Sequence, residues 1–91
     1  MHTQSIIHPG IKLRHIRVFL DAAAAGTLSA VARSHGISQP EVSRTLAELE
    51  TLLGNRLFER QGRRLSLTGP GSLFLRHANA GLRALDAGAM A

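Results

Sequence analysis

The chain has 91 residues, no cysteine and a formal net charge of +5 at pH 7. A chain of this length supports one domain with a modest core and leaves no room for two. The lack of cysteine excludes a disulfide framework and a thiolate metal site. No window holds the roughly 18 apolar residues of a membrane span, and no basic segment followed by an apolar run opens the chain. These features predict a cytoplasmic protein that makes no membrane contact.

Arginine supplies ten of the eleven basic Lys and Arg residues. Its planar guanidinium group matches phosphate oxygens and guanine edges, so a polyanionic partner is favoured. Charge alone leaves open the alternative that arginine only solubilises a small surface. The positions of the arginines must therefore decide between the two.

Two helices are expected after residues 1–10, which we predict to be a flexible tail. The first helix, residues 12–25, ends at Gly26 in a left-handed cap, and Thr27 can cap a short second helix that ends at Gly36. Apolar positions recur at helical spacing along the first helix and predict its packed face: Leu13, Ile16, Phe19, Leu20, Ala23 and Ala24.

The third helix has the strongest start signal in the chain. Ser38 and Glu41 form an S-x-x-E capping box, and Pro40 fits the first turn, where its missing N–H would have no helical partner. Leu53 and Gly54 mark the end of the helix. At about 100° per residue, Val42, Leu46, Leu49 and Leu53 form one packed stripe, which leaves the opposite face free.

A hairpin and a long last helix complete the expected elements. Two strand-like segments, residues 56–59 and 64–67, flank a basic turn at residues 60–63. Thr68 can cap the last helix, with Pro70 in its first turn. The predicted fold is mainly α: a winged helix-turn-helix with a three-helix core and a two-stranded β wing over residues 11–67, followed by a long linker helix over residues 68–91.

The free face of the third helix carries groups that can read base edges. Gln39 offers the donor and acceptor pair that matches adenine, Arg44 matches guanine, and Ser43 can serve either base. Ser38 and Glu41 are explained by capping, although Ser38 remains a candidate for a DNA contact at the helix N-terminus. This arrangement favours duplex DNA over the alternative of a merely solvated face.

The hairpin and the second helix supply further candidate contacts. Arg63 and Arg64 lie on a narrow loop, which suits the negative potential of a minor groove. For Arg60, an ion pair with a nearby carboxylate remains an alternative to a DNA contact. Thr27 and Ser29 can donate to phosphate, although capping explains Thr27 equally well.

Residues 13–71 resemble the N-terminal domain of LysR-type transcriptional regulators. The resemblance rests on a set of matching positions in one register: Leu13, Arg14, Phe19, Ala30, Ala32, Ser38, Gln39, Pro40, Ser43, Arg44, Leu49, Glu50, Leu53, Gly54, Leu57, Phe58, Glu59, Arg60, Leu67, Thr68 and Gly71. The family pattern departs at His35, where an apolar residue is usual, and at Gly69-Pro70, where the linker helix starts.

The resemblance implies that Gln39, Pro40 and Ser43 approach bases, that Arg44 contacts base or phosphate, and that Arg63 enters the minor groove. It implies a homodimer on an inverted-repeat operator and a higher oligomer in the full-length protein. The last helix then pairs with its counterpart through candidate interface residues: Leu73, Phe74, Leu75, Ala78, Leu82 and Leu85. An intramolecular core role remains open for part of that set.

Family members continue into a larger effector-binding domain, which we expect to be absent from these residues. Residues 11–15 and 74–78 are similar to the branch that activates aromatic-acid catabolism, notably the regulators of the protocatechuate pathway. No cofactor is expected.

Catalysis, and binding of protein or RNA, are the alternatives to DNA binding. The five His residues show no metal-ligand spacing, and no Ser or carboxylate pair has a catalytic context, so we expect neither an enzyme nor a metal protein. Binding of protein or RNA remains open because a fold does not determine a function. Readers of single-stranded RNA usually present stacking aromatics, whereas Phe19, Phe58 and Phe74 occupy predicted packing positions.

Overall fold

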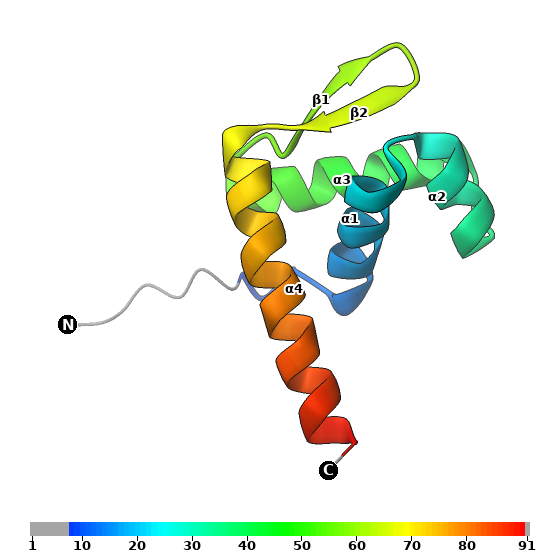
Figure 1. Ribbon diagram of the computed structural model, residues 1–91. Helices are drawn as coiled ribbons and strands as arrows, with labels where there is room; N and C mark the ends of the chain where they lie inside the picture. Colours follow the sequence, from blue (N-terminus) through cyan, green and yellow to red (C-terminus); the bar gives the residue numbers. More distant parts are fainter. Residues whose placement is uncertain (1–7, 91) are drawn as a thin grey trace.

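The computed structural model describes residues 8–90 and shows four helices and one two-stranded antiparallel sheet (Figure 1). The elements are α1 (Leu13–Ala25), α2 (Leu28–His35), α3 (Gln39–Leu53), β1 (Phe58–Gln61), β2 (Arg64–Leu67) and α4 (Gly69–Ala89). This arrangement confirms the predicted winged helix-turn-helix. Most of the expected tail, residues 1–7, lies outside the described residues. None of the four helices in residues 8–90 is long and apolar enough to cross a membrane.

The core lies where α1, α2 and α3 meet the root of the hairpin, which we call the wing. Phe19, Leu46, Leu49 and Leu57 are fully buried there. The ring centroid of Phe19 lies 5.5 Å from that of Phe58 and 5.1 Å from that of Phe74, within the range of favourable aromatic pairs. The chain contains no further aromatic residue, so its rings serve packing, as the sequence predicted.

The packed face of α1 agrees in part with the predicted one: Phe19 is buried, and Ile16, Leu20 and Ala23 pack against the core. His15, Val18, Phe19 and Ala22 are buried, whereas Leu13 is 49% exposed. Burial of a polar ring is tolerated because both of its nitrogens have partners. The backbone N–H of Lys12 donates to His15 Nδ1 at 2.9 Å, and His15 Nε2 lies 3.1 Å from Glu48 Oε1 on α3. The spacing of apolar residues along the sequence cannot predict the burial of His15, because this residue is polar and is buried with its hydrogen bonds satisfied.

The first wing strand also begins later than predicted, at residue 58 instead of 56. Gln61 pairs with Arg64, so the turn contains only Gly62 and Arg63, and Gly62 has the positive φ of 60° that such a tight turn requires. Arg60 and Gln61 therefore belong to β1. The predicted bounds of the second strand, residues 64–67, are confirmed.

The wing is attached to the turn between α1 and α2 as well. Thr27 forms an isolated antiparallel bridge with Arg64, and the Leu65 N–H donates to the Gly26 carbonyl at 2.8 Å. These backbone bonds extend the two-stranded sheet by one short segment. They hold the outer strand of the wing against the start of α2.

Three elements meet at the backbone of Leu57, just before β1. Glu50 Oε2, on α3, accepts from the Leu57 N–H at 2.8 Å and from the Phe58 N–H at 3.2 Å. The Leu57 carbonyl accepts from the Thr68 N–H at 3.0 Å, at the start of α4. A Cβ atom on Gly71 would lie 2.1 Å from that carbonyl oxygen. The first turn of α4 can approach the wing root this closely only because residue 71 has no side chain.

Gly71→Ala should therefore lower the free energy of unfolding by about 3 kcal/mol or more, the upper end of the range for overpacking, because the obstacle is backbone. Chemical denaturation at fixed protein concentration measures the change. Gly69→Ala is the matched control, since a Cβ there meets nothing within 4 Å. Equal stabilities for the two variants would show that α4 does not dock on the wing root as described.

Candidate nucleic-acid interface

The outward face of α3 presents the residues that the sequence singled out. Gln39, Pro40 and Arg44 are exposed near its N-terminus, and Ser43 is half-buried between them and the wing. α3 runs beneath the wing, and its N-terminal half and the wing tip both lie at the end of the domain away from α4 (Figure 1). The structure thus brings the four predicted base-reading residues onto one accessible helix end.

Ser38 is exposed, and its side chain acts as the cap of α3. Its Oγ accepts from the Glu41 N–H at 3.2 Å. Thr45, which the sequence did not single out, is buried one turn later and donates its hydroxyl to the Glu41 carbonyl at 2.9 Å. Both bonds stabilise the first turns of α3, and the Ser38 hydroxyl already has this structural role in the free domain.

Ser43 is joined to the wing by a hydrogen bond that the sequence did not predict. Arg60 Nη1 donates to Ser43 Oγ at 2.6 Å. The alternative of a carboxylate partner for Arg60 is wrong, because no carboxylate oxygen among residues 8–90 lies within 4.0 Å of its guanidinium group. The signal that could have found this contact is the position of Arg60 two residues after the buried Phe58, which places both side chains on one face of the strand.

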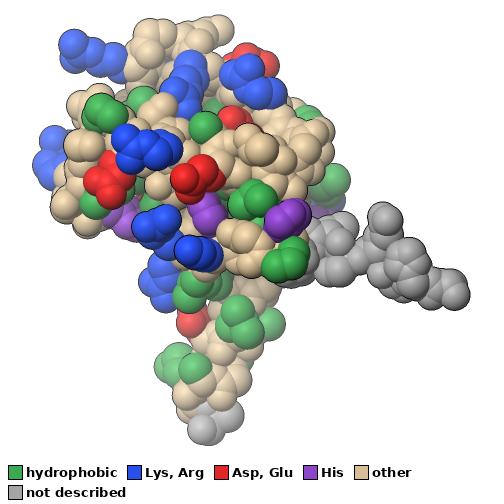
Figure 2. Space-filling view, turned by 180° about the vertical axis from the view of Figure 1, so that it is seen from behind, with side chains coloured by type: hydrophobic (Ala, Val, Ile, Leu, Met, Phe, Trp, Pro, Cys, Tyr) green, Lys and Arg blue, Asp and Glu red, His purple; other side chains and the backbone are tan. Residues whose placement is uncertain are grey.

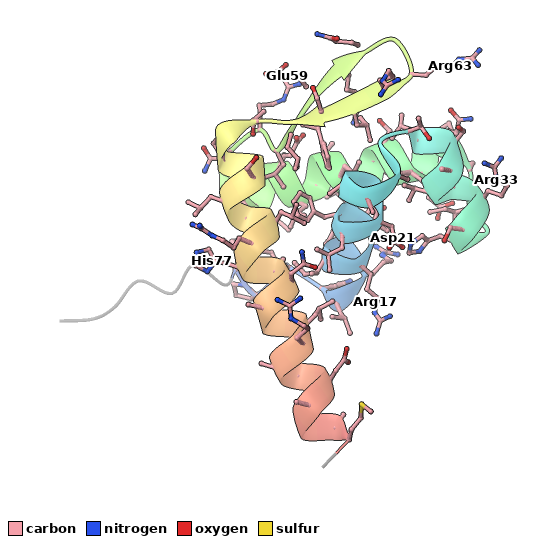
Figure 3. All side chains as sticks on the ribbon, viewed as in Figure 1. Arg17, Asp21, Arg33, Glu59, Arg63 and His77 are labelled. Atoms are coloured by element: carbon pink, nitrogen blue, oxygen red, sulfur yellow. The ribbon has the colours of Figure 1, made fainter. Side chains whose placement is uncertain are left out.

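The other wing arginines are exposed. Arg63 occupies the turn and projects from the tip away from the body of the domain (Figure 3). Arg64 begins β2 and is bridged through its backbone to Thr27. Thr27 Oγ1 accepts from the Ala30 N–H at 3.3 Å, and Ser29 beside it is half-buried. The structure therefore brings the candidate phosphate contacts of α2 next to the wing.

A second group of cations lies beside Arg44. Lys12, Arg14 and Arg44 line an open hollow of about 490 Å³ between the start of α1 and the outward face of α3. The sequence did not single out Lys12 or Arg14 as candidate contacts. The view from behind shows Lys and Arg side chains spread over the body of the domain, with acidic groups between them (Figure 2). The basic surface thus extends beyond the outward face of α3.

An apolar groove runs along α4, next to the basic hollow, since Leu52 lines both. It has a volume of about 1220 Å³ and receives side chains from α1, the end of α3 and one face of α4. Leu73 and Leu85 line it and are 53% and 65% exposed. Five of the six predicted interface residues line this groove; the exception is Leu75, which packs against the core.

No group of three His, Asp or Glu side chains within residues 8–90 is arranged to hold a metal ion. His35, at the position that departs from the expected pattern, has a specific partner instead. Its Nε2 lies 2.6 Å from Asp21 Oδ2, so it links α2 to α1. The second departure from the family pattern is Gly69-Pro70. Pro70 occupies the first turn of α4, and the helix continues from Gly69 to Ala89.

Comparison with known proteins decides the family. Residues 13–72 match the model for bacterial regulatory helix-turn-helix proteins of the lysR family. The chain belongs to this family. Its architecture agrees with solved LysR-type structures, including the DNA complex of the BenM DNA-binding domain with catB site 1, with a TM-score of 0.82 at 31% identity over 88% of this chain and 90% of that one. The complex of the CbnR DNA-binding domain with DNA also gives a TM-score of 0.82, at 33% identity over 87% and 91% of the two chains.

Curated relatives of this LysR-family chain are named as transcriptional regulators. The uncharacterised HTH-type regulator YdcI of Escherichia coli K12 is 46% identical over 96% of this chain, and PcaQ of Agrobacterium fabrum is 41% identical over 82% of it. The chain spans only 27% and 24% of the lengths of these two proteins. What the matched region shares with them is therefore the helix-turn-helix part.

Ser38→Ala should lower the free energy of unfolding of this LysR-family domain by about 1 kcal/mol, because the Glu41 N–H loses its cap. Ser38→Asn should restore most of the loss, since its side-chain oxygen can accept the same bond. Thermal denaturation measures the difference. Ser72→Ala, at an exposed position in the first turn of α4, is the control; a loss no larger than that of Ser72→Ala would contradict the capping role.

Proposed function

We propose that this chain is the operator-reading part of a bacterial LysR-type transcription regulator and binds duplex DNA with sequence preference. The observation that carries the proposal is the exposed N-terminal face of α3, where Gln39, Pro40 and Arg44 lie around Ser43, flanked by the wing arginines. Such a helix end, with its outward side chains exposed, fits a major groove. The activity is binding and not catalysis, which agrees with the names of the curated relatives.

Each candidate group has a chemical role on the duplex. Gln39 and Arg44 offer side chains that match adenine and guanine edges, and Ser43 supplies one shorter contact. Arg63 projects from the wing tip and suits the adjacent minor groove, where the potential is most negative. Arg64, Thr27 and Ser29 lie together beside the wing and serve the phosphate backbone, which fixes register without reading sequence.

The groove along α4 supports a homodimer. Within residues 8–90 the apolar groove lined by Leu73 and Leu85 stays open, and a second copy of α4 would cover it, because burial of apolar surface drives association. A two-fold dimer presents two copies of α3 with opposite polarity, which demands an inverted-repeat operator. In this proposal residues 11–67 form the DNA-binding domain and residues 68–91 the linker and dimerisation helix.

The remaining parts of the proposal concern the longer protein. The small share of the curated relatives that this chain spans supports a regulator with a further effector-binding region and a higher oligomeric state. Action on chromosomal DNA implies a cytoplasmic location. The likeness to PcaQ supports membership of the branch that activates aromatic-acid catabolism.

Gln39→Ala should weaken binding to the preferred duplex by about 1–3 kcal/mol and leave binding to random DNA nearly unchanged, because base contacts carry the sequence preference. The preferred duplex comes from selection among random sequences, and fluorescence anisotropy at stated salt measures the affinities. Thr51→Ala, exposed farther along the same helix, is the control and should change neither. Equal losses of Gln39→Ala on both DNAs would contradict base reading, and the absence of any enriched inverted repeat would contradict the proposed function.

Leu85→Glu should convert the dimer into monomers and reduce affinity for the inverted repeat towards that for a half-site, because a charge would be buried in an apolar interface. Sedimentation equilibrium measures the assembly state. Ala84→Glu introduces the same charge at the neighbouring exposed residue, which does not line the groove, and should leave the dimer intact. A dimer that persists in Leu85→Glu would place the interface elsewhere.

A further inference from the structure

Arg60 is the wing residue that reaches the recognition face of α3. In the register of the hairpin it lies opposite Leu65, which is buried, and two residues after the buried Phe58. Side chains that lie opposite each other, or two residues apart, share one face of a sheet. The Arg60 side chain therefore leaves the wing on the face turned towards the core and α3, whereas Arg63 projects from the tip (Figure 3).

The bond between Arg60 and Ser43 has a fixed polarity. A guanidinium group carries only N–H donors and stays charged, so Arg60 Nη1 donates and Ser43 Oγ accepts, at 2.6 Å. A serine hydroxyl has one donor hydrogen and two acceptor lone pairs. Because a positive group occupies the acceptor side of Ser43, the approach of a second N–H donor is electrostatically disfavoured. The hydroxyl hydrogen is left to point away from Arg60.

We infer that Arg60 is a positioning residue that makes Ser43 a hydrogen-bond donor to the major-groove edge of a base. The inference rests on the proposed function, in which α3 reads that groove. Guanine N7 and O6, adenine N7 and thymine O4 are acceptors, whereas cytosine presents an amino donor there. Ser43 oriented by Arg60 therefore discriminates against cytosine at the base that it contacts, although a free serine hydroxyl would tolerate every base.

The test measures base preference, which a purely structural role of Arg60 would not move. The probes are the selected duplex and its single-base variants at the position where Ser43→Ala abolishes preference. Arg60→Ala should reduce discrimination against cytosine there by roughly two- to tenfold, the range expected for one hydrogen bond. The double variant should discriminate no worse than Ser43→Ala alone, because Arg60 acts on base preference only through Ser43. Arg60→Lys, which retains a charged donor, should recover part of the preference.

Arg63→Ala is the matched control. It removes the same charge from the same hairpin, at a residue whose side chain projects away from α3 (Figure 3). It should weaken all duplexes of the set alike and leave the preference at the Ser43-dependent base intact. The thermal unfolding midpoint of Arg60→Ala should lie only slightly below that of Arg63→Ala, because Arg60 is exposed and one hydrogen bond to Ser43 is lost.

Two results would overturn the role of Arg60 and leave the proposed function standing. One is an equal loss of affinity for Arg60→Ala on every duplex with a salt slope lowered by about 1, which identifies a phosphate contact. The other is independent, additive effects of Arg60→Ala and Ser43→Ala on base preference. A wild-type chain that prefers no duplex would overturn the proposed function itself, and the role of Arg60 with it. If Arg60→Ala does not fold, the folded Arg60→Lys variant and its crystal structure replace it. Base preference retained with Lys Nζ bonded to Ser43 Oγ would support the inference, and preference retained without that bond would overturn it.

Discussion

The backbone of Leu57 is the point on which the rest of the structure depends. Its N–H donates to Glu50 at the end of α3, and its carbonyl accepts from Thr68 at the start of α4. Its side chain is fully buried in the core. Buried backbone N–H and C=O groups must each find a hydrogen-bond partner. Here each partner comes from a different element, so one residue sets the directions of α3, the wing and α4 together.

This junction has a consequence for DNA recognition. The N-terminal end of α3 lies at the end of the domain away from α4 (Figure 1), whereas the wing root lies beside the start of α4 and Leu57 there lines the apolar groove. A rigid connection between that end of α3 and the groove means that a dimer formed through the groove would hold its two recognition helices at a defined separation. At Gly71 the first turn of α4 packs directly against the backbone of Leu57. Such close packing resists movement of α4 relative to the wing root. Operator spacing in the proposed complex would then be a property of the protein alone.

Hydrogen bonds of polar side chains supplement the core at its edges. His15 joins α1 to Glu48 on α3, and His35 joins α2 to Asp21 on α1. The Arg60 contact with Ser43 adds a third such link, between the wing and α3. Apolar patterns do not reveal these links, since the partners lie 33, 14 and 17 residues apart in the chain. The first of these links explains why His15 was missing from the predicted packed face of α1, and the third shows which partner Arg60 has.

What the sequence by itself determined is local: the start of α3 at the Ser38 cap, the ends of three helices at glycine, and the succession of helices and hairpin. These features follow from bonds and backbone angles within a few residues, so the chain's own order reveals them. Tertiary structure alone decided which face of α1 is buried, that the wing turn contains only Gly62 and Arg63, and that Ser43 meets Arg60. The buried face of α1 and the contact of Ser43 with Arg60 depend on segments far apart in sequence, which meet only when the core closes around Phe19 and Leu57. The turn depends on the register in which the two wing strands pair.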